Sequence, residues 1–216
     1  MTILNKLATS LGRRDEVPNQ LLAAEIVRTK DKRAVQELVQ NLSHKDKGIQ
    51  SDCIKVLYEI GESAPLLIAP HYKVLGALLE SRNNRLVWGA MTALDAISAV
   101  EPEGTYGLLG KVLKATDEGS VITRDHAVGI LTKLASKKQY TAKCFPLLLE
   151  QLRACPNNQL PMYAEKSLAL FESGPGTGVM SLKMSADLEK VLTKRLSGLE
   201  KESQKVRVAK VLKRLH

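Results

Sequence analysis

Aromatic side chains are scarce in this sequence: they make up 4% of the 216 residues, and Trp88 is the single tryptophan. A core with so few rings has to be filled by leucine, alanine and valine, which suits helices that pack closely. Glycine and proline fall mostly between the apolar segments. The composition therefore predicts a helical protein whose helices are joined by short turns.

Cysteine is also rare, and Cys53, Cys144 and Cys155 stand at none of the spacings that metal sites use. An odd number of cysteines fits a reducing compartment. The first residues, MTILNKLATSLGRR, hold no continuous apolar stretch of signal-peptide length. No apolar run approaches the ~18 residues of a membrane helix. We therefore expect a cytoplasmic protein that does not insert into a membrane.

Catalytic motifs are missing as well. The glycine-rich segment SGPGTG follows a helical pattern and no lysine comes after it, so it does not match a phosphate-binding loop. No two of the four histidines stand at i, i+4, and on a helix His126 would point away from the preceding Asp125. We therefore predict no catalytic residue, no metal and no cofactor, and we predict that the chain is not an enzyme.

The chain is organised around the stretch 84–97, NRLVWGAMTALDAI. Its apolar and small residues fall on one face of a helix at about 100° per residue. These residues are Leu86, Ala90, Ala93, Leu94 and Ile97. The second of them is small, as expected where a helix must come close to its neighbours.

Copies of this pattern recur along the chain. Steps of 37 residues give equivalent sets that start at Ile49, Thr123 and Leu160, and the last two sets carry the polar residues Thr123 and Ser167. A further copy starts at Gln204 after an insertion of seven residues, and a weaker copy starts at Asn19. Partner helices follow the same step, marked by Leu38, Leu75, Val112 and Leu149. A repeat of this length with two helices per unit predicts an α-solenoid.

The strings IQSDCIKVLYEI and LVWGAMTALDAI resemble the second-helix pattern of the HEAT-repeat family, whose members are armadillo-like α-solenoids, and KVRVAKVLKRL carries the Val-Arg start of that pattern. The resemblance covers nearly the whole chain. It implies an all-α fold, a right-handed α-α superhelix of about five to six HEAT-like helical hairpins. The motif encodes packing and therefore says little about activity.

We expect a single solenoid over residues 1–216. Within it we expect a weak first repeat at 1–30, core repeats at 31–173, an inserted connector at 173–184 and a C-terminal capping pair at 185–216.

Trp88 is the most informative residue for function, because it lies nearly opposite the apolar stripe of its helix. In a solenoid, the face away from the partner helix lines the concave surface, which is the usual binding side. An aromatic, a tyrosine and methionines among charges have the composition of an interface. The candidate binding residues are Tyr58, Trp88, Met91, Thr92, Asp95, Asp125 and Met162. The alternative is that superhelical twist tucks Trp88 against the next repeat. The pattern favours a scaffold that binds a protein or peptide partner.

Basic residues are in excess, with 32 lysines and arginines against 23 acids and a net charge of +9. Such an excess suits polyanions such as nucleic acid. The candidate anion contacts are Arg85, Arg124, Lys205, Arg207, Lys210 and Arg214. A soluble basic protein with scattered charge and a capping C-terminal helix would show the same excess.

A second hypothesis is therefore nucleic-acid binding. The chain resembles the HEAT-like alkylpurine DNA glycosylases in size, helical make-up and positive charge, and this resemblance implies a concave basic cleft with tryptophans and an aspartate. Trp88 and Asp95 are the only matching pair, and the aspartate spacing departs from that family's pattern. A regulatory role towards an enzyme complex rests on fold analogy alone. The oligomeric state is left open.

Overall fold

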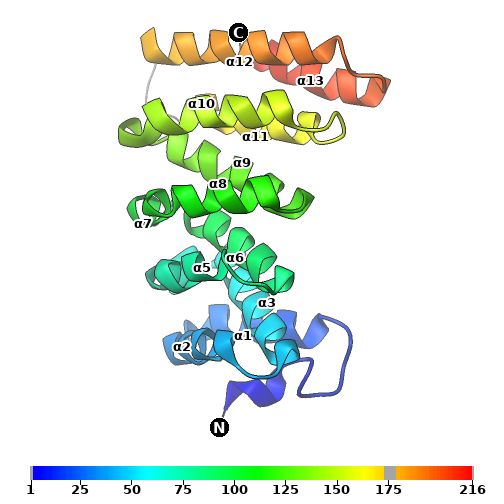
Figure 1. Ribbon diagram of the computed structural model, residues 1–216. Coiled ribbons are helices and arrows are strands. Elements are labelled where there is room, and N and C mark those ends of the chain that lie inside the picture. The colour runs from blue at the N-terminus through cyan, green and yellow to red at the C-terminus, as the bar shows by residue number, and fades with distance from the viewer. Residues whose placement is uncertain (1, 173–178, 216) are drawn as a thin grey trace. The chain divides into compact units, whose positions relative to one another are not determined.

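The computed structural model describes residues 2–172 and 179–215, which form helices and turns with no strand (Figure 1). Contacts between residues divide the chain into two compact units, residues 1–126 and 127–216. The boundary falls inside helix α9, Val121–Ala135. Among the described residues, no helix is long and apolar enough to span a lipid bilayer.

The first unit consists of short helices arranged in pairs. Its elements are η1 (Ile3–Lys6), α1 (Val17–Thr29), α2 (Lys32–Gln40), η2 (Asn41–Ser43), α3 (Lys47–Ser63), α4 (Pro65–Ile68), η3 (Ala69–His71), α5 (Tyr72–Leu78), α6 (Asn84–Ile97), α7 (Pro102–Gly107), α8 (Leu109–Glu118) and the start of α9. Helix α3 packs against α1 and α6, so that the second helices of successive pairs stack on one another (Figure 1).

The second unit follows the same plan. Besides the rest of α9 it contains α10 (Lys138–Ala154), α11 (Leu160–Glu172), α12 (Val179–Leu196) and α13 (Glu202–Arg214). Helix α10 packs against α12, and α11 packs against α13. Helix α10 is continuous through Pro146.

Helix starts follow the chemistry of capping. The carboxylate of Asp31 accepts hydrogen bonds from the backbone N–H groups of Arg33 and Ala34 and so caps α2. Asp46 and Asn83 cap α3 and α6 in the same way. The EPEG segment at 101–104 follows α6 and begins the next helix, because Glu101 caps α7.

The boundary of the predicted connector at 173–184 is wrong on its C-terminal side. Helix α12 begins at Val179, so residues 179–184 belong to a helix. Residues 173–178 lie outside the described residues. The capping pair predicted at 185–216 is thus α12 and α13, with α12 beginning six residues earlier than predicted.

The repeated apolar skeleton forms the core. In the two copies that start at Ile49 and Leu86, every skeleton residue is buried, and so are the four partner-helix residues 38, 75, 112 and 149. The polar members are also buried, but each bonds within its own segment. Thr123 donates its hydroxyl to the carbonyl of Ser120 at 2.6 Å, and Ser167 donates to that of Tyr163 at 2.8 Å. Local bonding removes the cost of burying these hydroxyls.

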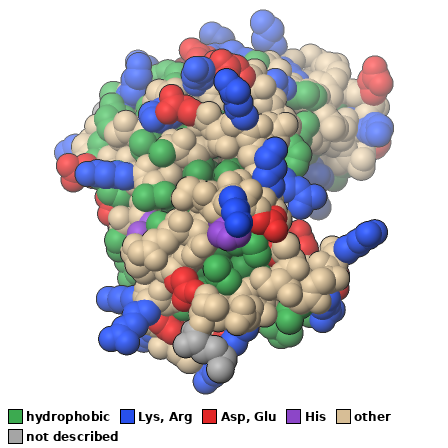
Figure 2. All heavy atoms as spheres, turned by 60° about the horizontal axis from the view of Figure 1, so that its bottom comes forward, with side chains coloured by type: hydrophobic (Ala, Val, Ile, Leu, Met, Phe, Trp, Pro, Cys, Tyr) green, Lys and Arg blue, Asp and Glu red, His purple; other side chains and the backbone are tan. Residues whose placement is uncertain are grey.

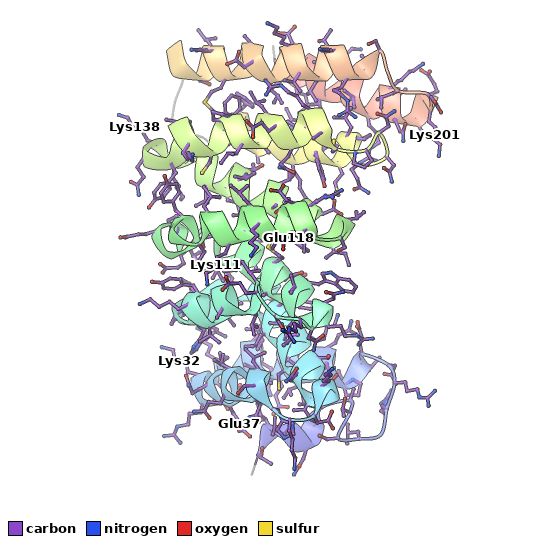
Figure 3. The ribbon with its side chains drawn as sticks, in the orientation of Figure 1. Lys32, Glu37, Lys111, Glu118, Lys138 and Lys201 are labelled. Atoms are coloured by element: carbon purple, nitrogen blue, oxygen red, sulfur yellow. The ribbon has the colours of Figure 1, made fainter. Side chains whose placement is uncertain are left out.

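Ion pairs and hydrogen bonds join neighbouring elements at the surface. Lys111 of α8 donates to Glu80 beyond the end of α5 at 2.6 Å, and this hydrogen bond lowers the pKa of Glu80 (Figure 3). Glu37 of α2 accepts from the backbone N–H of Ile3 at 3.2 Å and from the Thr2 hydroxyl, which ties the N-terminal turn to α2 (Figure 3). This N-terminal turn is the short helix η1.

The α3–α6 contact depends on Gly89, because a Cβ at this position would lie 2.4 Å from Cγ1 and 3.0 Å from Cγ2 of Ile54. Ile54 is buried and β-branched, so it has little rotamer freedom with which to move away. The two helices can approach this closely only where one of them lacks a side chain.

We predict that Gly89→Ala destabilises the protein, whereas Gly110→Ala stabilises it. Overpacking at Ile54 should cost about 1–3 kcal/mol, which exceeds the gain of up to ~1 kcal/mol from the better helix former. A Cβ at Gly110, an exposed position in α8, meets nothing within 4 Å, so there only the gain remains. Urea unfolding followed by circular dichroism measures both changes. A Gly89→Ala midpoint equal to or above the wild-type value would contradict the tight contact.

All three cysteines are free and buried, and burial raises the pKa of each thiol, to about 12 for Cys53 and about 11 for Cys144. Because the thiolate is the nucleophile, we expect a disulfide reagent at pH 8 to modify these cysteines only after the chain is unfolded. The rate at which the reagent modifies the folded chain should rise with pH only as the pH approaches the raised pKa values of the thiols. An exposed thiol introduced by Ser10→Cys is the control and should react at once. Rapid reaction of the native wild-type chain would contradict the predicted burial.

Candidate functional site

A groove in the first unit is lined by the segment that leads into α1 and by residues of α3 and α6, and we call it the α1–α3–α6 groove. It consists of two adjoining cavities of about 680 and 320 Å³, which share Glu16, Ser51, Lys55 and Arg85. The larger cavity extends to residues 8–16 and the smaller one to Ile122 at the start of α9. Volumes of this size are typical of sites that hold a ligand.

The smaller cavity forms the apolar end of the groove. Trp88 is half-buried there, with Ile54, the backbone of Gly89 and the exposed Ile122 in the same lining. The glycine that lets α6 approach α3 also leaves the space beside the indole open. Trp88 is thus part of a surface pocket in the first unit, as the predicted role in binding requires.

Lys55 separates the two ends of the groove. Its ammonium lies 2.8 Å from a carboxylate oxygen of Glu16, 2.7 Å from one of Glu59 and 4.8 Å from the centre of the Tyr58 ring. Partial burial lowers the pKa of Lys55, but hydrogen bonds to the two glutamates outweigh it and the net shift is upward. Burial also raises the pKa of Tyr58. Lys55 therefore stays charged, and its charge is balanced inside the protein.

The larger cavity forms the polar end. Arg13 pairs with Asp15 at 2.9 Å within the same turn. The carboxylate of Asp52 accepts from the backbone N–H of Thr9 at 2.7 Å and from the side-chain amide of Asn19 at 2.8 Å. Asn19 in turn accepts from the N–H of Ala8 at 3.0 Å. These bonds fix the N-terminal turn as one wall of the groove.

Three further cations line the same cavity: Arg14 before α1, Lys47 at the start of α3 and Arg85 at the start of α6. No described residue makes an ion pair or hydrogen bond with any of these three side chains. Arg85, predicted as an anion contact, thus stands in the groove together with two cations that the sequence analysis did not select.

Thr92, Asp95 and His126 form a chain of hydrogen bonds between α6 and α9. His126 Nδ1 lies 2.9 Å from Asp95 Oδ2, and Nε2 lies 3.0 Å from the Thr92 hydroxyl. That hydroxyl also lies 3.0 Å from the carbonyl of Trp88, to which it donates. The interaction secures α9 next to the turn of α6 that carries the indole.

The order hydroxyl, imidazole and carboxylate matches that of a hydrolytic triad, but two features of Thr92 oppose that role. Its hydroxyl is shared between the imidazole and the Trp88 carbonyl, each at 3.0 Å. The backbone N–H groups around it are held in the middle of α6, so they are not available to stabilise an oxyanion. The arrangement is that of a structural bridge. Among the described residues, no group of His, Cys, Asp and Glu could hold a metal ion.

Met91 and Arg207, which were predicted as site residues, contribute to the fold instead. Met91 is fully buried in the core, so its prediction as a surface contact is wrong. Arg207 is held by Glu165 through two hydrogen bonds of 2.7 and 2.6 Å, so this predicted anion contact is already paired with an acid.

The other predicted residues are distributed as follows. Asp95 is bonded to His126, Asp125 is half-buried with an interaction of its own, and Arg124 donates to the carbonyl of Thr116 at 3.3 Å. Met162, Lys205, Lys210 and Arg214 lie in the second unit, where Arg214 also has a partner. Of the predicted residues, the groove brings together Tyr58, Arg85, Trp88 and Thr92.

The second unit has a cavity of about 370 Å³, lined by Arg153, Asp187, Lys190, Val191, Lys194 and Arg195. The guanidinium of Arg195 donates to the carbonyls of Leu152 and Cys155 at 3.0 and 2.8 Å and so caps the end of α10. Over the face drawn in Figure 2, lysine and arginine side chains are interspersed with acids.

Comparison with solved structures identifies the fold. A designed armadillo repeat protein in complex with the peptide (KR)4 is 16% identical, with a TM-score of 0.64, over 99% of this chain and 100% of that one. An archaeal HEAT-like repeat protein from Thermococcus onnurineus NA1 is 14% identical, with a TM-score of 0.50, over 93% of this chain and 97% of that one. The chain has the HEAT/armadillo repeat fold.

This HEAT/armadillo fold confirms the predicted fold class, all-α and built of HEAT-like helical hairpins. Computationally designed armadillo repeat proteins for modular peptide recognition match at 15% identity and a TM-score of 0.64, over 99% of this chain and all of that one. No protein-family model and no curated protein matches the sequence. The similarity to known proteins therefore lies in the repeat fold.

We predict that His126→Ala destabilises the first unit by about 1–3 kcal/mol, because Asp95, with only 13% of its side chain exposed, would lose a hydrogen-bond partner. His71→Ala is the matched control: His71 is half-buried and no described residue bonds to its ring. Thermal unfolding of both variants measures the difference. Equal losses in the two variants would show that the bridge contributes nothing.

Proposed function

We propose that this HEAT/armadillo repeat protein is a non-enzymatic scaffold that binds a peptide segment of a partner protein in the α1–α3–α6 groove. The observation that carries the proposal is the pocket around Trp88, where the chain's only tryptophan lines a cavity that also exposes Ile122. Half-buried aromatic residues beside a pocket are typical binding hot spots. The likeness to designed armadillo repeat proteins in complex with peptide supports the same assignment.

The geometry supports the glycosylase alternative less well. That hypothesis needs Asp95 beside Trp88 in an open cleft, yet Oδ2 of Asp95 is bonded to His126 and the side chain is mostly buried. Non-catalytic nucleic-acid binding stays a second candidate, because Arg14, Lys47 and Arg85 face the groove. DNA binding of this kind would weaken steeply between about 50 and 200 mM salt.

We expect Trp88→Ala to weaken binding of groove-directed peptides by roughly 30-fold, as a hot spot of about 2 kcal/mol would. Peptides would be selected from a displayed library on the wild-type chain, and their affinities for both proteins measured by calorimetry. The matched control is Leu66→Ala, which removes an exposed apolar side chain of α4 outside the groove.

Two results would contradict the proposal. One is a library that yields no peptide binding to the folded wild-type chain. The other is peptide affinity that Trp88→Ala leaves unchanged while circular dichroism shows the variant to be folded.

A further inference from the structure

The polar end of the α1–α3–α6 groove carries an unbalanced positive charge. Its acids are Asp15, Glu16 and Asp52. Asp15 is paired with Arg13 and Glu16 with Lys55, which leaves Asp52 as the one carboxylate of the lining without an ion pair among the described residues. Against it stand the three unpaired cations Arg14, Lys47 and Arg85. The end of the groove is therefore positive after internal pairing.

The three cations have a regular placement. Arg14 stands in the turn before α1, whereas Lys47 and Arg85 stand in the first turns of α3 and α6, and α3 packs against both α1 and α6. Packed helices lie about 10 Å apart, and an extended peptide rises about 3.3 Å per residue. A peptide laid across the three helix starts would therefore meet a cation about every third residue.

The charge then changes along the groove. Lys55 is shared between Glu16 and Glu59, so its charge is balanced inside the protein. Beyond it, the lining by Ile54, Trp88 and Ile122 is apolar. Arg85 lies at the junction, because it lines both cavities. One ligand that occupies both cavities would need negative charge at one end and an apolar side chain at the other.

We propose that the partner segment is an acidic peptide, with Asp or Glu residues against Arg14, Lys47 and Arg85 and a neighbouring apolar side chain against Trp88. This inference rests on the proposed function and adds the chemistry of the ligand. It gives the ligand a charge opposite to that of the (KR)4 peptide bound by the designed armadillo repeat protein. Unbalanced cations in a groove with low-dielectric walls attract anionic groups and raise their local concentration.

The observations favour a peptide over nucleic acid. The carboxylate of Asp52 also lines the larger cavity and would repel a continuous phosphate backbone. Three unpaired cations are also few beside the roughly 6–10 phosphate contacts of strongly salt-dependent DNA binders. Carboxylates spaced along a peptide can avoid Asp52, whereas phosphates on every nucleotide cannot.

The test uses three labelled peptides that share an apolar Leu-Phe end and differ in an eight-residue segment, which is (DE)4, (NQ)4 or (KR)4. Binding to the full chain is followed by anisotropy, and the Trp88 emission reports occupation of the apolar end. We expect (DE)4 to bind about tenfold or more tightly than (NQ)4, and (KR)4 to bind least, as expected for up to three ion pairs.

The decisive variant reverses all three groove cations: Arg14→Glu, Lys47→Glu and Arg85→Glu. It should lose about 10- to 100-fold in affinity for the (DE)4 peptide and gain affinity for the (KR)4 peptide. The matched control reverses Arg28, Lys32 and Arg33 to Glu, which changes the net charge equally at exposed sites of α1 and α2 that do not line the groove. The control should retain its affinity within about threefold.

The outcomes distinguish a failure of the acidic-ligand proposal from a failure of the proposed scaffold function. If the peptides bind with Trp88-dependent affinity but (NQ)4 or (KR)4 binds as well as (DE)4, the acidic ligand is wrong and the scaffold function stands. If no peptide binds the folded chain, both fail. If a single-stranded oligonucleotide of eight phosphates binds more tightly than (DE)4 and loses affinity in the groove variant, the groove is a nucleic-acid site and the acidic-peptide proposal is overturned.

Discussion

The close approach of α3 and α6 is the constraint on which the first unit depends. Gly89 lies against Ile54, and the small residues Cys53 and Ala90 are fully buried on the same two helices. Bulkier residues at these positions would push the helices apart and change the line formed by their first turns. That line carries Lys47 and Arg85, so the packing of the core also sets the spacing of the charges in the groove.

Polar contacts, rather than a long helix of its own, hold the N-terminal turn in position. Asn19 occupies the first skeleton position of the weak first copy, where an apolar residue would bury itself between helices. Its amide instead links the backbone of Ala8 to Asp52 of α3. Asn19 therefore both breaks the apolar pattern of the first copy and holds the N-terminal turn in place as a wall of the groove. A network of such hydrogen bonds is specific in its geometry, which suits the end of a binding groove.

The fold could be predicted from sequence because a fixed step of 37 residues places the same apolar positions on every second helix. The site could be predicted only in part. Met91 was assigned to the surface because one apolar stripe was assumed, whereas a helix with neighbours on three sides buries a wider arc. His126 was missed because its bond to Asp95 joins residues 31 apart rather than 37. Arg207 finds Glu165 at a separation of 42, which the insertion near residue 175 moved out of register.

The charged residues show most clearly what cannot be predicted from the sequence, namely which cations stay unpaired in the folded chain. A net charge of +9 indicates that some part of the protein attracts anions. A lysine or arginine can bind a ligand, however, only if its charge is not already paired with an acid or bonded to a backbone carbonyl of the protein. Arg13, Lys55 and Arg207 are neutralised by acids, and Arg195 is committed to the carbonyl end of α10. Their pairings join residues that are 2 to 43 positions apart, so no periodic rule finds them. Arg14, Lys47 and Arg85 differ from these residues in having no side-chain partner in the described part of the chain, and only the folded chain shows that they line the same cavity. The preference of the groove for an anion therefore follows from which cations are left unpaired, and only indirectly from their total number.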